Sequence, residues 1–217
     1  MGSSRLPNKM LLHLHGQPVV SWVFIRMQRC KILDRLVFAI PEGNRDNVLQ
    51  ILLESLGAEV FRGPEEDVLH RYIKVAKITS VDNVVRICAD NPLISWEAVD
   101  LLIQEHLSSK ADYTYNHIPI SNSWPDGLGA EICTQKTLQH LHEVSRKSED
   151  REHVFNYLTK NPDLFNIHTF DPPKQSWKQP ELKLDLDTLN DYEKLMKHPI
   201  FPEMTVDEII RAFRDKL

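Results

Sequence analysis

Two patterns of apolar and polar positions alternate along the first half of the chain. Short, continuous apolar runs that end at glycine, proline or polar residues are typical of strands buried on both faces. Between them, apolar residues recur three or four positions apart, as on one face of a helix. The pattern predicts strands at 36–40, 59–61 and 84–88 and helices at 47–56, 66–78 and 95–107. This alternation favours βαβ units, an α/β class and a mostly parallel sheet.

The second half of the chain is less regular, beginning near residue 110. Pro119, Pro125, Gly127 and Gly129 interrupt the periodicity there, and the stretch 170–182 is rich in Pro, Lys and Gln, which indicates an exposed loop. Beyond the interruption, the pattern predicts helices at 135–146, 149–159, 191–197 and 205–213 and an alternating strand at 182–187. Thr205 and Glu208 have the spacing of a capping box, which supports the last helix.

The first residues carry no strand pattern, since no apolar run precedes the polar segment 2–9. A doubly wound domain normally begins with a central strand that leads into its first loop. We therefore expect the sheet to lack its first strand. We expect one domain over residues 1–217, which suits a chain of this length.

Charge and cysteine usage narrow the class of function. With 26 basic and 31 acidic side chains, the net charge of −5 disfavours binding to DNA or RNA, although a small phosphorylated substrate needs only a local basic cluster. A membrane span needs about 18 consecutive apolar residues, and no run in this chain is that long. We therefore expect no membrane partner. The cysteines are few, scattered and without metal spacing, which predicts free thiols in a reducing cytoplasm: Cys30, Cys88 and Cys133.

Two segments could carry phosphate or metal chemistry. In 2–9, Gly2 allows close approach of the backbone, Ser3 and Ser4 offer hydroxyl groups, and Arg5 and Lys9 add positive charge. The alternative is a flexible polar terminus. Asp90 directly follows a predicted buried strand, where a carboxylate is well placed to hold Mg²⁺. The alternative is that Asp90 and Pro92 only form a turn.

Other charged groups have both a functional and a plain structural interpretation. Asp185 and Asp187 share a face of the predicted strand 182–187 and could bring a second carboxylate to the Asp90 site, or could be solvated residues at a strand end. Asp67 and Arg71 suit an i,i+4 helix pair. His13 and His15 would share a strand face, but two histidines are too few for a convincing metal site.

Seven short segments follow one another in an order that covers nearly the whole chain. They are Gly2-Ser3-Ser4-Arg5-Leu6-Pro7-Asn8-Lys9; Gly16-Gln17-Pro18; Arg62-Gly63-Pro64-Glu65-Glu66-Asp67-Val68-Leu69-His70-Arg71-Tyr72; Arg86-Ile87-Cys88-Ala89-Asp90-Asn91-Pro92-Leu93; Asp112-Tyr113, Asn116, Pro125-Asp126-Gly127 and Glu131; Asp150-Arg151-Glu152-His153-Val154; and Leu184-Asp185-Leu186-Asp187-Thr188 with Asp191. Together they resemble the cytidylyltransferases that make CMP-activated sugars, such as the CMP-sialic acid and CMP-Kdo synthetases, and within them the branch of spore coat polysaccharide biosynthesis.

The resemblance implies a Rossmann-like, three-layer nucleotidyltransferase fold that works as a homodimer. It implies transfer of CMP from CTP to an acidic, nonulosonic-acid-like sugar for surface polysaccharide or glycan biosynthesis, with release of pyrophosphate. The implied residue roles form four sets. They are the CTP phosphate site of Gly2, Ser3, Ser4, Arg5 and Lys9; the Mg²⁺ ligands Asp90 and Asp187; Arg71 and Arg86, which place the triphosphate or brace the site; and Asn116, Asp126, Glu131, Arg151 and His153, which face the sugar or the dimer partner. Arg5, Lys9 and Asp90 would be the catalytic residues.

The chain departs from the family pattern at several places. The family has an apolar strand ending in Gln-Ala-Arg before the first loop, and this chain has Asn91 and Lys183 where the branch usually has Cys and Arg. Two other functions stay open on the residues alone. A GT-A-type glycosyltransferase would use an Asp-x-Asp string, which Asp185-Leu186-Asp187 matches late in the chain. A non-catalytic, truncated remnant would bind a partner instead.

Overall fold

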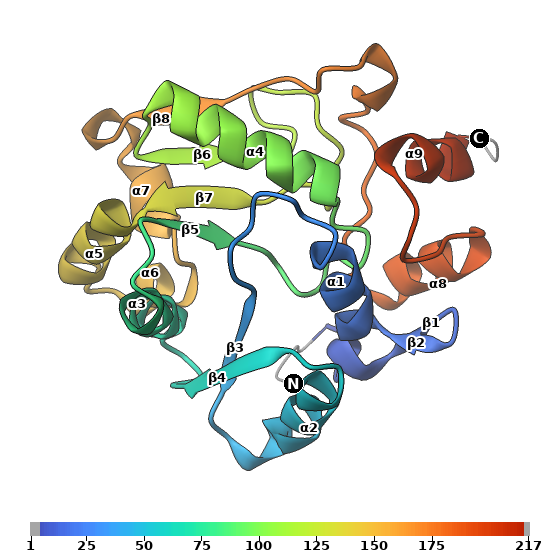
Figure 1. Cartoon of the computed structure of the whole chain (residues 1–217), viewed down its shortest axis with the longest axis horizontal. Helices are drawn as coiled ribbons and strands as arrows, with labels where there is room; N and C mark the ends of the chain where they lie inside the picture. Colours follow the sequence, from blue (N-terminus) through green and yellow to red (C-terminus); the bar gives the residue numbers. More distant parts are fainter. Residues whose placement is uncertain (1–4, 215–217) are drawn as a thin grey trace.

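The computed structural model describes residues 5–214 and has the α/β fold that the sequence predicts (Figure 1). The helices are α1 (Val19–Met27), α2 (Asn47–Ser55), α3 (Val68–Thr79), α4 (Trp96–Ser109), α5 (Gln135–Val144), α6 (Ser148–Glu152), α7 (Asn156–Lys160), α8 (Leu189–Lys197) and α9 (Val206–Arg214). The strands are β1 (His13–Leu14), β2 (Gln17–Pro18), β3 (Val37–Pro41), β4 (Glu59–Gly63), β5 (Asn83–Arg86), β6 (Tyr113–Tyr115), β7 (Glu131–Thr134) and β8 (Ile167–Thr169). Residues 5–214 also contain four short 3₁₀ turns: η1 (Lys9–Leu11), η2 (Asn44–Asp46), η3 (Pro162–Leu164) and η4 (Gln175–Trp177).

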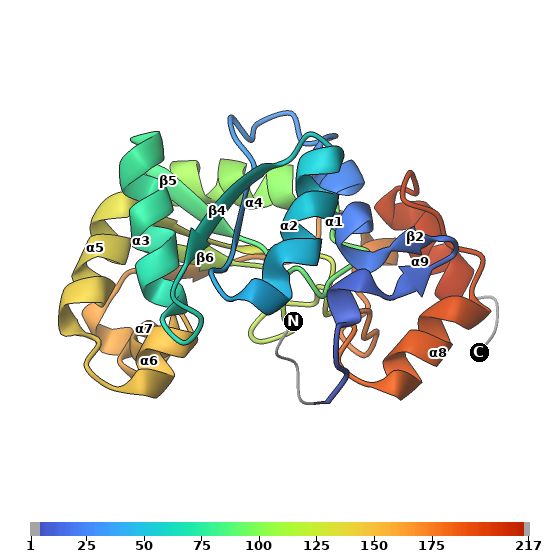
Figure 2. The ribbon, with the colours of Figure 1, turned by 90° about the horizontal axis from the view of Figure 1, so that it is seen from below.

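Helices cover the strands from two opposite faces, and β7 shows this at the level of single residues. Ile132 packs in one apolar cluster with residues of α1 and α4, whereas Cys133 packs in another with residues of α3 and α5. Successive side chains of a strand point to opposite faces, so β7 lies in a middle layer. Figure 2 shows the strands between α4 on one side and α6 and α7 on the other.

The strands form three groups of mixed direction. Strands β3 and β4 are parallel and are joined by α2, which is the βαβ unit that the sequence predicts. A second group has the order β5-β7-β6-β8, in which β6 and β8 are parallel but β7 is antiparallel to both of its neighbours. Strand β7 reverses direction because the connection from β6 is a loop over residues 116–130 rather than a crossover helix.

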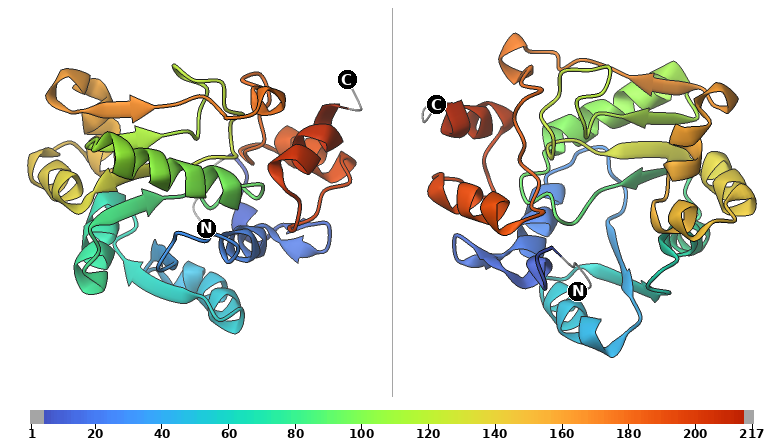
Figure 3. Two further views of the ribbon diagram at one scale, coloured as in Figure 1. Left: turned by 45° about the horizontal axis from the view of Figure 1, so that its top comes forward. Right: turned by 180° about the vertical axis from the view of Figure 1, so that it is seen from behind.

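The third strand group is a small hairpin of β1 and β2. The turn of this hairpin contains His15 and Gly16, both with positive φ. Of the two histidines that were expected to share a strand face, only His13 therefore lies in a strand. Figure 3 shows the two last helices, α8 and α9, gathered near this hairpin and α1. An apolar cluster that includes Trp22, Trp124 and Trp177 fills the space between these elements.

Helix boundaries follow the sequence closely in the first half and near the C-terminus. The Oγ atom of Ser95 accepts a hydrogen bond from the amide of Ala98 and caps α4, and Thr205 and Glu208 form the expected reciprocal cap before α9. The predicted helix 149–159 is wrong as one element. It is split into α6 and α7, because the chain turns at 153–155 and buries Val154 and Phe155.

The predicted strand 182–187 is also wrong as an element, although its alternation is correct. Leu184 and Leu186 are fully buried, as one face of a strand would be. Among residues 5–214, however, this segment makes only an isolated bridge from Lys183 to Asp126 and single hydrogen bonds to neighbouring loops. The segment therefore lies against loops that offer no continuous partner strand.

A buried arginine joins distant parts of the chain. Arg26 of α1 is fully buried, and its guanidinium donates hydrogen bonds to the carbonyl oxygens of Ile94 (2.5 Å), Pro202 (2.8 Å) and Met204 (2.9 Å). Burial lowers the pKa of Arg26 to about 9, so the side chain is still charged at neutral pH. Helix α1 is thereby tied to the loop before α4 and to the segment before α9.

Candidate active site

The loop that follows β5 brings Asp90 next to a segment from the far end of the chain. The amide of Leu186 donates to the carbonyl oxygen of Asp90 at 2.9 Å, which aligns the segment 184–187 with the loop. Asp90 lies just beyond the carboxyl end of a strand, where ligands of open α/β sheets bind. The two carboxylates that the sequence singles out, Asp90 and Asp187, are thus brought together from positions almost 100 residues apart.

Lys9 of η1 places its ammonium between these two carboxylates. Its Nζ atom lies 2.5 Å from Oδ2 of Asp90 and 3.1 Å from Oδ1 of Asp187, and it also donates to the carbonyl oxygen of Leu186 at 3.1 Å. Burial by itself lowers the pKa of Lys9, but the two carboxylates more than offset this effect and raise the pKa above its usual value. Lys9 is therefore firmly protonated.

Arg5 adds a second positive charge at the same place. Its Nη2 atom lies 2.9 Å from Oδ2 of Asp187, while its side chain is 64% exposed, so this pair is weak and easily exchanged. Gly2, Ser3 and Ser4, the other predicted phosphate-binding residues, lie outside the described residues. We call the group of Arg5, Lys9, Asp90 and Asp187 the carboxylate–lysine cluster.

The position of Asp187 depends on the cap of α8. The Oδ2 atom of Asp191 accepts hydrogen bonds from the amides of Thr188 (2.7 Å) and Asp187 (3.2 Å) and from the hydroxyl of Thr188 (2.7 Å). Burial by itself raises the pKa of Asp191, but these hydrogen bonds outweigh it and the pKa is lowered. Thr188 and Asp191 form a full capping box, which the spacing Thr-x-x-Asp could have indicated.

Two further carboxylates border the carboxylate–lysine cluster. The backbone of Asp126 exchanges hydrogen bonds with Leu182 and Leu184, and a Cβ atom at Gly127 would lie 2.7 Å from the amide nitrogen of Asp185. Burial, and next the charge of Asp185, raises the pKa of Asp126 to about 6. Burial also raises the pKa of Asp185, although Lys183, at 3.3 Å, opposes the shift.

A separate buried group spans β5, β7 and β6. Arg86 forms an ion pair with Oε1 of Glu131, and the hydroxyl of Tyr113 donates to Oε2 of Glu131 at 2.5 Å. Burial by itself raises the pKa of Glu131, but the Arg86 charge outweighs it and the pKa is lowered. His117, 3.9 Å from Glu131, has its pKa lowered mainly by burial and is neutral at pH 7. This group braces three strands together.

Two other predicted site residues use their polar atoms inside the fold. Arg71 donates to the carbonyl oxygens of Pro64 (3.0 Å) and Glu65 (3.4 Å) and holds the turn that follows β4. Asn116 is fully buried, donates to the carbonyl of Ala98 and accepts from the amide of Ala130, each at 2.9 Å.

The α6 residues lie in another part of the molecule. Arg151 binds Oδ2 of Asp67 through Nε (2.7 Å) and Nη2 (2.6 Å), so the expected Asp67–Arg71 helix pair is replaced by a link between α3 and α6. His153 is exposed at the end of α6. In Figure 1, α6 lies beside α3 and α5, on the opposite side of the molecule from α8.

The sequence analysis missed two features of the site, and only one of them leaves a signal in the sequence. The Leu186 carbonyl that binds Lys9 has no side-chain signal, because a backbone acceptor is present at every residue. The ion pair of Lys183 and Asp185 could have been found from their i,i+2 spacing on one face. The three cysteines are free, as expected, and burial raises the pKa of Cys88, beside Asp90, to about 11.

The arrangement of Asp90 and Asp187 suits a hard cation. Both carboxylates approach the single positive charge of Lys9, so they already converge on one point. Two carboxylates that converge in this way, with further oxygens supplied by phosphates, match the way in which proteins hold Mg²⁺. No group of three or more His, Cys, Asp or Glu side chains is arranged as a metal site within residues 5–214.

A family comparison covers nearly the whole chain, and two curated proteins are similar over almost all of it. The sequence model described as "Cytidylyltransferase" matches residues 1–209. An uncharacterized protein of Methanocaldococcus jannaschii is 34% identical over 99% of this chain and 87% of its own length. The spore coat polysaccharide biosynthesis protein SpsF of Bacillus subtilis is 30% identical over 97% of this chain and 89% of its own length.

A solved structure has the same arrangement of elements over the entire chain. The cytidylyltransferase from Leptospira borgpetersenii superposes with a TM-score of 0.90 at 27% identity, over 100% of this chain and 91% of the other. None of the helices in residues 5–214 has the length and apolar character needed to cross a bilayer.

Proposed function

Because this chain belongs to the cytidylyltransferase family, we propose that it transfers CMP from CTP to an acidic, nonulosonic-acid-like sugar and releases pyrophosphate. The observation that carries the proposal is the carboxylate–lysine cluster, where two carboxylates share one cation beyond the carboxyl end of β5. The similarity to a protein named for spore coat polysaccharide biosynthesis supports a role in a surface polysaccharide or glycan.

The proposed metal is Mg²⁺, with Asp90 and Asp187 as its protein ligands. When bound, this ion would neutralise phosphate charge and stabilise the departing oxygens. Lys9 and Arg5 now neutralise these two carboxylates, so a divalent ion in that role leaves both side chains free to contact phosphate oxygens. The order of binding that we expect is therefore metal together with nucleotide.

The residues of the chain act mainly by positioning and charge. Phosphoryl and nucleotidyl transfer need little covalent chemistry from the protein, and negative charge builds up on the pyrophosphate as it leaves. Lys9 stays protonated and Arg5 is permanently charged, so both can stabilise that charge, together with Gly2, Ser3 and Ser4 of the same segment. Arg71 and Arg86 are proposed to brace the site rather than to touch phosphates, since both guanidinium groups already bind protein oxygens.

The sugar side is proposed to include Asp126, which lies next to the carboxylate–lysine cluster. A carboxylate with a pKa near 6 is suited to accept a hydrogen bond or proton from the attacking hydroxyl. Asn116 and Glu131 position the surrounding strands, because their polar atoms bind other residues. Residues 110–180 form the proposed sugar-binding and dimerisation part of a single domain, in which Arg151 and His153 face the partner subunit of a cytoplasmic homodimer.

The experiment is an assay of pyrophosphate release with CTP, Mg²⁺ and a panel of sugar acids, with UTP and ATP in parallel. We expect CTP-dependent release with at least one acid. Asp90→Asn should lower turnover by at least 100-fold with the fold intact, since it removes a charged metal ligand. Asp163→Asn, an exposed carboxylate on η3, is the matched control.

Two further experiments, with sugar-nucleotide donors and with calorimetric titration of nucleotides, separate the alternative functions. Consumption of a sugar nucleotide in place of CTP would favour a glycosyltransferase. Failure of every nucleotide to bind in calorimetric titration would favour a non-catalytic protein. Undiminished turnover in Asp90→Asn would contradict the metal assignment.

A further inference from the structure

Four charged side chains form one polar face beside the carboxylate–lysine cluster. Asp126 and Lys183 are partners in an isolated bridge, and paired residues of neighbouring segments project to the same side. Asp185 and Asp187 follow at alternate positions, while the fully buried leucines between them point the other way. We call Asp126, Lys183, Asp185 and Asp187 the polar face. It begins at the cluster, to which Asp187 belongs, and runs along the segment toward Lys183.

Backbone contacts hold the polar face in register. The amide of Asp126 donates to the carbonyl oxygen of Leu182, and the amide of Leu184 donates to the carbonyl oxygen of Asp126, both at 3.0 Å. Gly127 has a positive φ of 90°, and its backbone lies so close to the segment that a Cβ atom would be 2.7 Å from the amide nitrogen of Asp185. Asp185 is therefore fixed next to Asp126 by the backbone rather than by its own side chain.

The carboxylate of Asp185 has hydrogen-bonding capacity that the fold does not use. Its Oδ2 atom lies 3.3 Å from Nζ of Lys183, whose side chain is 49% exposed, so this ion pair contributes little. Its Oδ1 atom is buried, and no other residue within 5–214 donates a hydrogen bond to it. A buried acceptor without a donor costs stability, so this oxygen points to a ligand that supplies the donor.

Asp185 is not placed to be a further ligand of the proposed metal. Side chains two residues apart on an extended segment are about 6–7 Å apart at the backbone. Two carboxylates on one Mg²⁺ each bring an oxygen to within about 2 Å of the ion. Asp187 reaches such a point beside Lys9 and Asp90, whereas Asp185 pairs with Lys183 in the other direction. The unused oxygen of Asp185 therefore suits a different kind of ligand.

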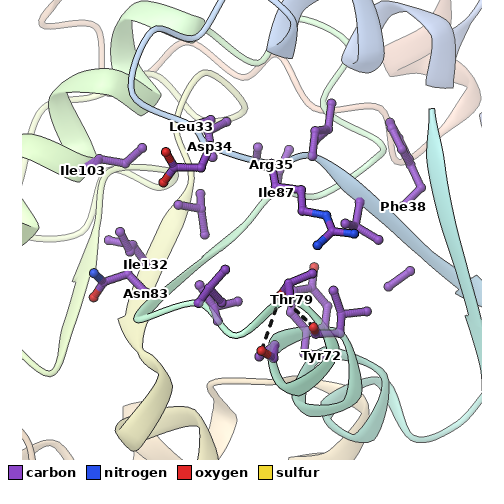
Figure 4. Close-up of a pocket in the computed structure, with 18 of the residues that line it drawn as sticks. Leu33, Asp34, Arg35, Phe38, Tyr72, Thr79, Asn83, Ile87, Ile103 and Ile132 are labelled. Carbon is purple, nitrogen blue, oxygen red and sulfur yellow. Dashed lines mark hydrogen bonds between the residues drawn. The ribbon is translucent and has the colours of Figure 1, made fainter. Parts of the chain in front are cut away.

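A cavity of about 500 Å³ between β3 and β5 does not suit a sugar as well as the polar face does (Figure 4). Most of the side chains that line this cavity are apolar, among them Phe38, Ile87, Ile103 and Ile132. Sugar hydroxyls need hydrogen bonds when they leave water, and apolar walls offer none. The polar face offers carboxylate oxygens next to the candidate metal site.

We propose that Asp185 determines which sugar is accepted, because its carboxylate accepts a hydrogen bond from a ring hydroxyl other than the one that attacks CTP. This inference rests on the function proposed above. Along the polar face, Asp185 lies between Asp187, proposed to hold the metal, and Asp126, proposed to accept from the attacking hydroxyl. A sugar that reaches both ends of the face passes over Asp185. The exposed Lys183 balances the charge of Asp185 until the sugar binds.

The experiment is a thermodynamic cycle between the residue and the sugar. The probes are the most active sugar acid of the pyrophosphate-release panel and its analogues that each lack one ring hydroxyl. In the wild type, one analogue should lower kcat/KM at least tenfold, as expected when a hydrogen bond to a charged group is lost. Asp185→Ala should show the same loss with the parent sugar and no further loss with that analogue. The KM for CTP and the Mg²⁺ requirement should not change.

Two other variants separate this contact from general effects of charge. Asp185→Asn keeps one oxygen acceptor, so it should retain part of the discrimination that Asp185→Ala loses. Glu181→Gln removes an exposed carboxylate from the same segment, four residues earlier, and is the matched control. It should discriminate between the parent sugar and the analogue as the wild type does.

A second measurement needs no activity. Because Asp185 has an unpartnered oxygen and lies beside Asp126 and Asp187, Asp185→Asn should unfold at or above the transition temperature of the wild type without nucleotide. A carboxylate that served the fold would instead be missed. A fall of more than about 3 °C in this variant would therefore assign Asp185 to the fold and overturn the inference.

The kinetic outcomes separate this inference from the proposed function. Pyrophosphate release that Asp185→Ala leaves unchanged, or a variant that loses the same factor with the parent sugar and with every analogue, would overturn the specificity role alone. A raised Mg²⁺ requirement would make Asp185 a metal ligand and would also overturn it. If no sugar acid supports release by the wild type, the proposed function fails and the inference fails with it.

Discussion

Lys9 is the residue on which the candidate site depends most. Its single ammonium touches carboxylates 81 and 178 positions away in the sequence and a backbone oxygen between them. Hydrogen bonds to charged groups contribute about 1.5–3 kcal/mol each when they are well made. Lys9 therefore has two effects, on the stability of the free protein and on the charge available to a substrate.

Replacing Lys9 by methionine should expose this double role. Without the ammonium, Asp90 and Asp187 repel each other, and we expect the free energy of unfolding to fall by about 1–3 kcal/mol in metal-free buffer. Millimolar Mg²⁺ should restore part of the loss, while turnover stays low. Urea unfolding with and without Mg²⁺ measures this, and Lys174→Met, which breaks an exposed pair with Asp207, is the control expected to change stability by less than about 1 kcal/mol. A Mg²⁺-independent loss would contradict the proposed metal position.

Asp126 should make stability depend on pH. Its pKa is raised to about 6 in the folded chain from an ordinary 3.8, so between about pH 4 and pH 6 the folded state binds more protons than the unfolded state. Stability from this group is therefore present at low pH and is lost as pH rises through 6. Relative to the Asp126→Asn variant, the wild type should lose about 1–2 kcal/mol of unfolding free energy between pH 4.5 and pH 7.5. This estimate of the loss allows for the half-exposure of the Asp126 side chain. Urea unfolding at both pH values tests this, and parallel pH profiles would refute it.

At the scale of elements, the sequence predicts helices better than strands in this chain. Helices α2 and α4 are recognisable because Gly57 with positive φ after α2, the Ser95 cap of α4 and the apolar spacing of both helices are local properties. The break between α6 and α7 is not local, since it exists to bury Val154 and Phe155 against α3 and α5. Likewise, the alternation at 182–187 predicts burial correctly, but strand pairing needs a partner that only the tertiary fold could have provided.

The link between α3 and α6 can be dissected at one residue. Asp67 caps α3 by accepting from the amide of His70 at 2.8 Å, and it also binds Arg151. Asp67→Asn keeps the cap and removes the charge, whereas Asp67→Ala removes both. We expect the free energy of unfolding to fall by less than about 1 kcal/mol in Asp67→Asn and by about 1–3 kcal/mol in Asp67→Ala, as measured by urea unfolding. Equal losses in the two variants would show that the cap contributes nothing.

Close packing of two backbone segments should make Gly129 irreplaceable. A Cβ atom there would overlap the carbonyl group and side-chain amide of Asn116, so Gly129→Ala forces the start of β7 away from the end of β6. We expect the free energy of unfolding of Gly129→Ala to fall by at least about 3 kcal/mol, as it does for severe packing defects. Gly43→Ala is the matched control, because its nearest new contact would be an ordinary 3.9 Å and its φ is −66°. Thermal unfolding compares them; similar transition temperatures would contradict this account.

At the scale of the whole molecule, the α/β class follows from periodicity, and the family follows from motif order. The meeting of Asp90 with Asp187 is only one of two interpretations on the residues alone, and the resemblance is what favours it, because no local rule relates positions so far apart. The internal use of Asn116 and the pairing of Asp67 with Arg151 could not be expected at all, since both depend on side chains that meet only in the folded chain.

The buried guanidinium of Arg26 sets a limit on when this protein can become native during synthesis. Two of its carbonyl partners, Pro202 and Met204, emerge from the ribosome 176 and 178 residues after it. Lys9 binds Asp187, which is synthesised 178 residues after it. Closing such long loops is slow, and until then the guanidinium of Arg26 lacks two of its three carbonyl partners. We expect ribosome-bound chains that lack residues 187–204 to leave these contacts unmade, so that α1 and the segment of Lys9 stay sensitive to protease until those residues have emerged.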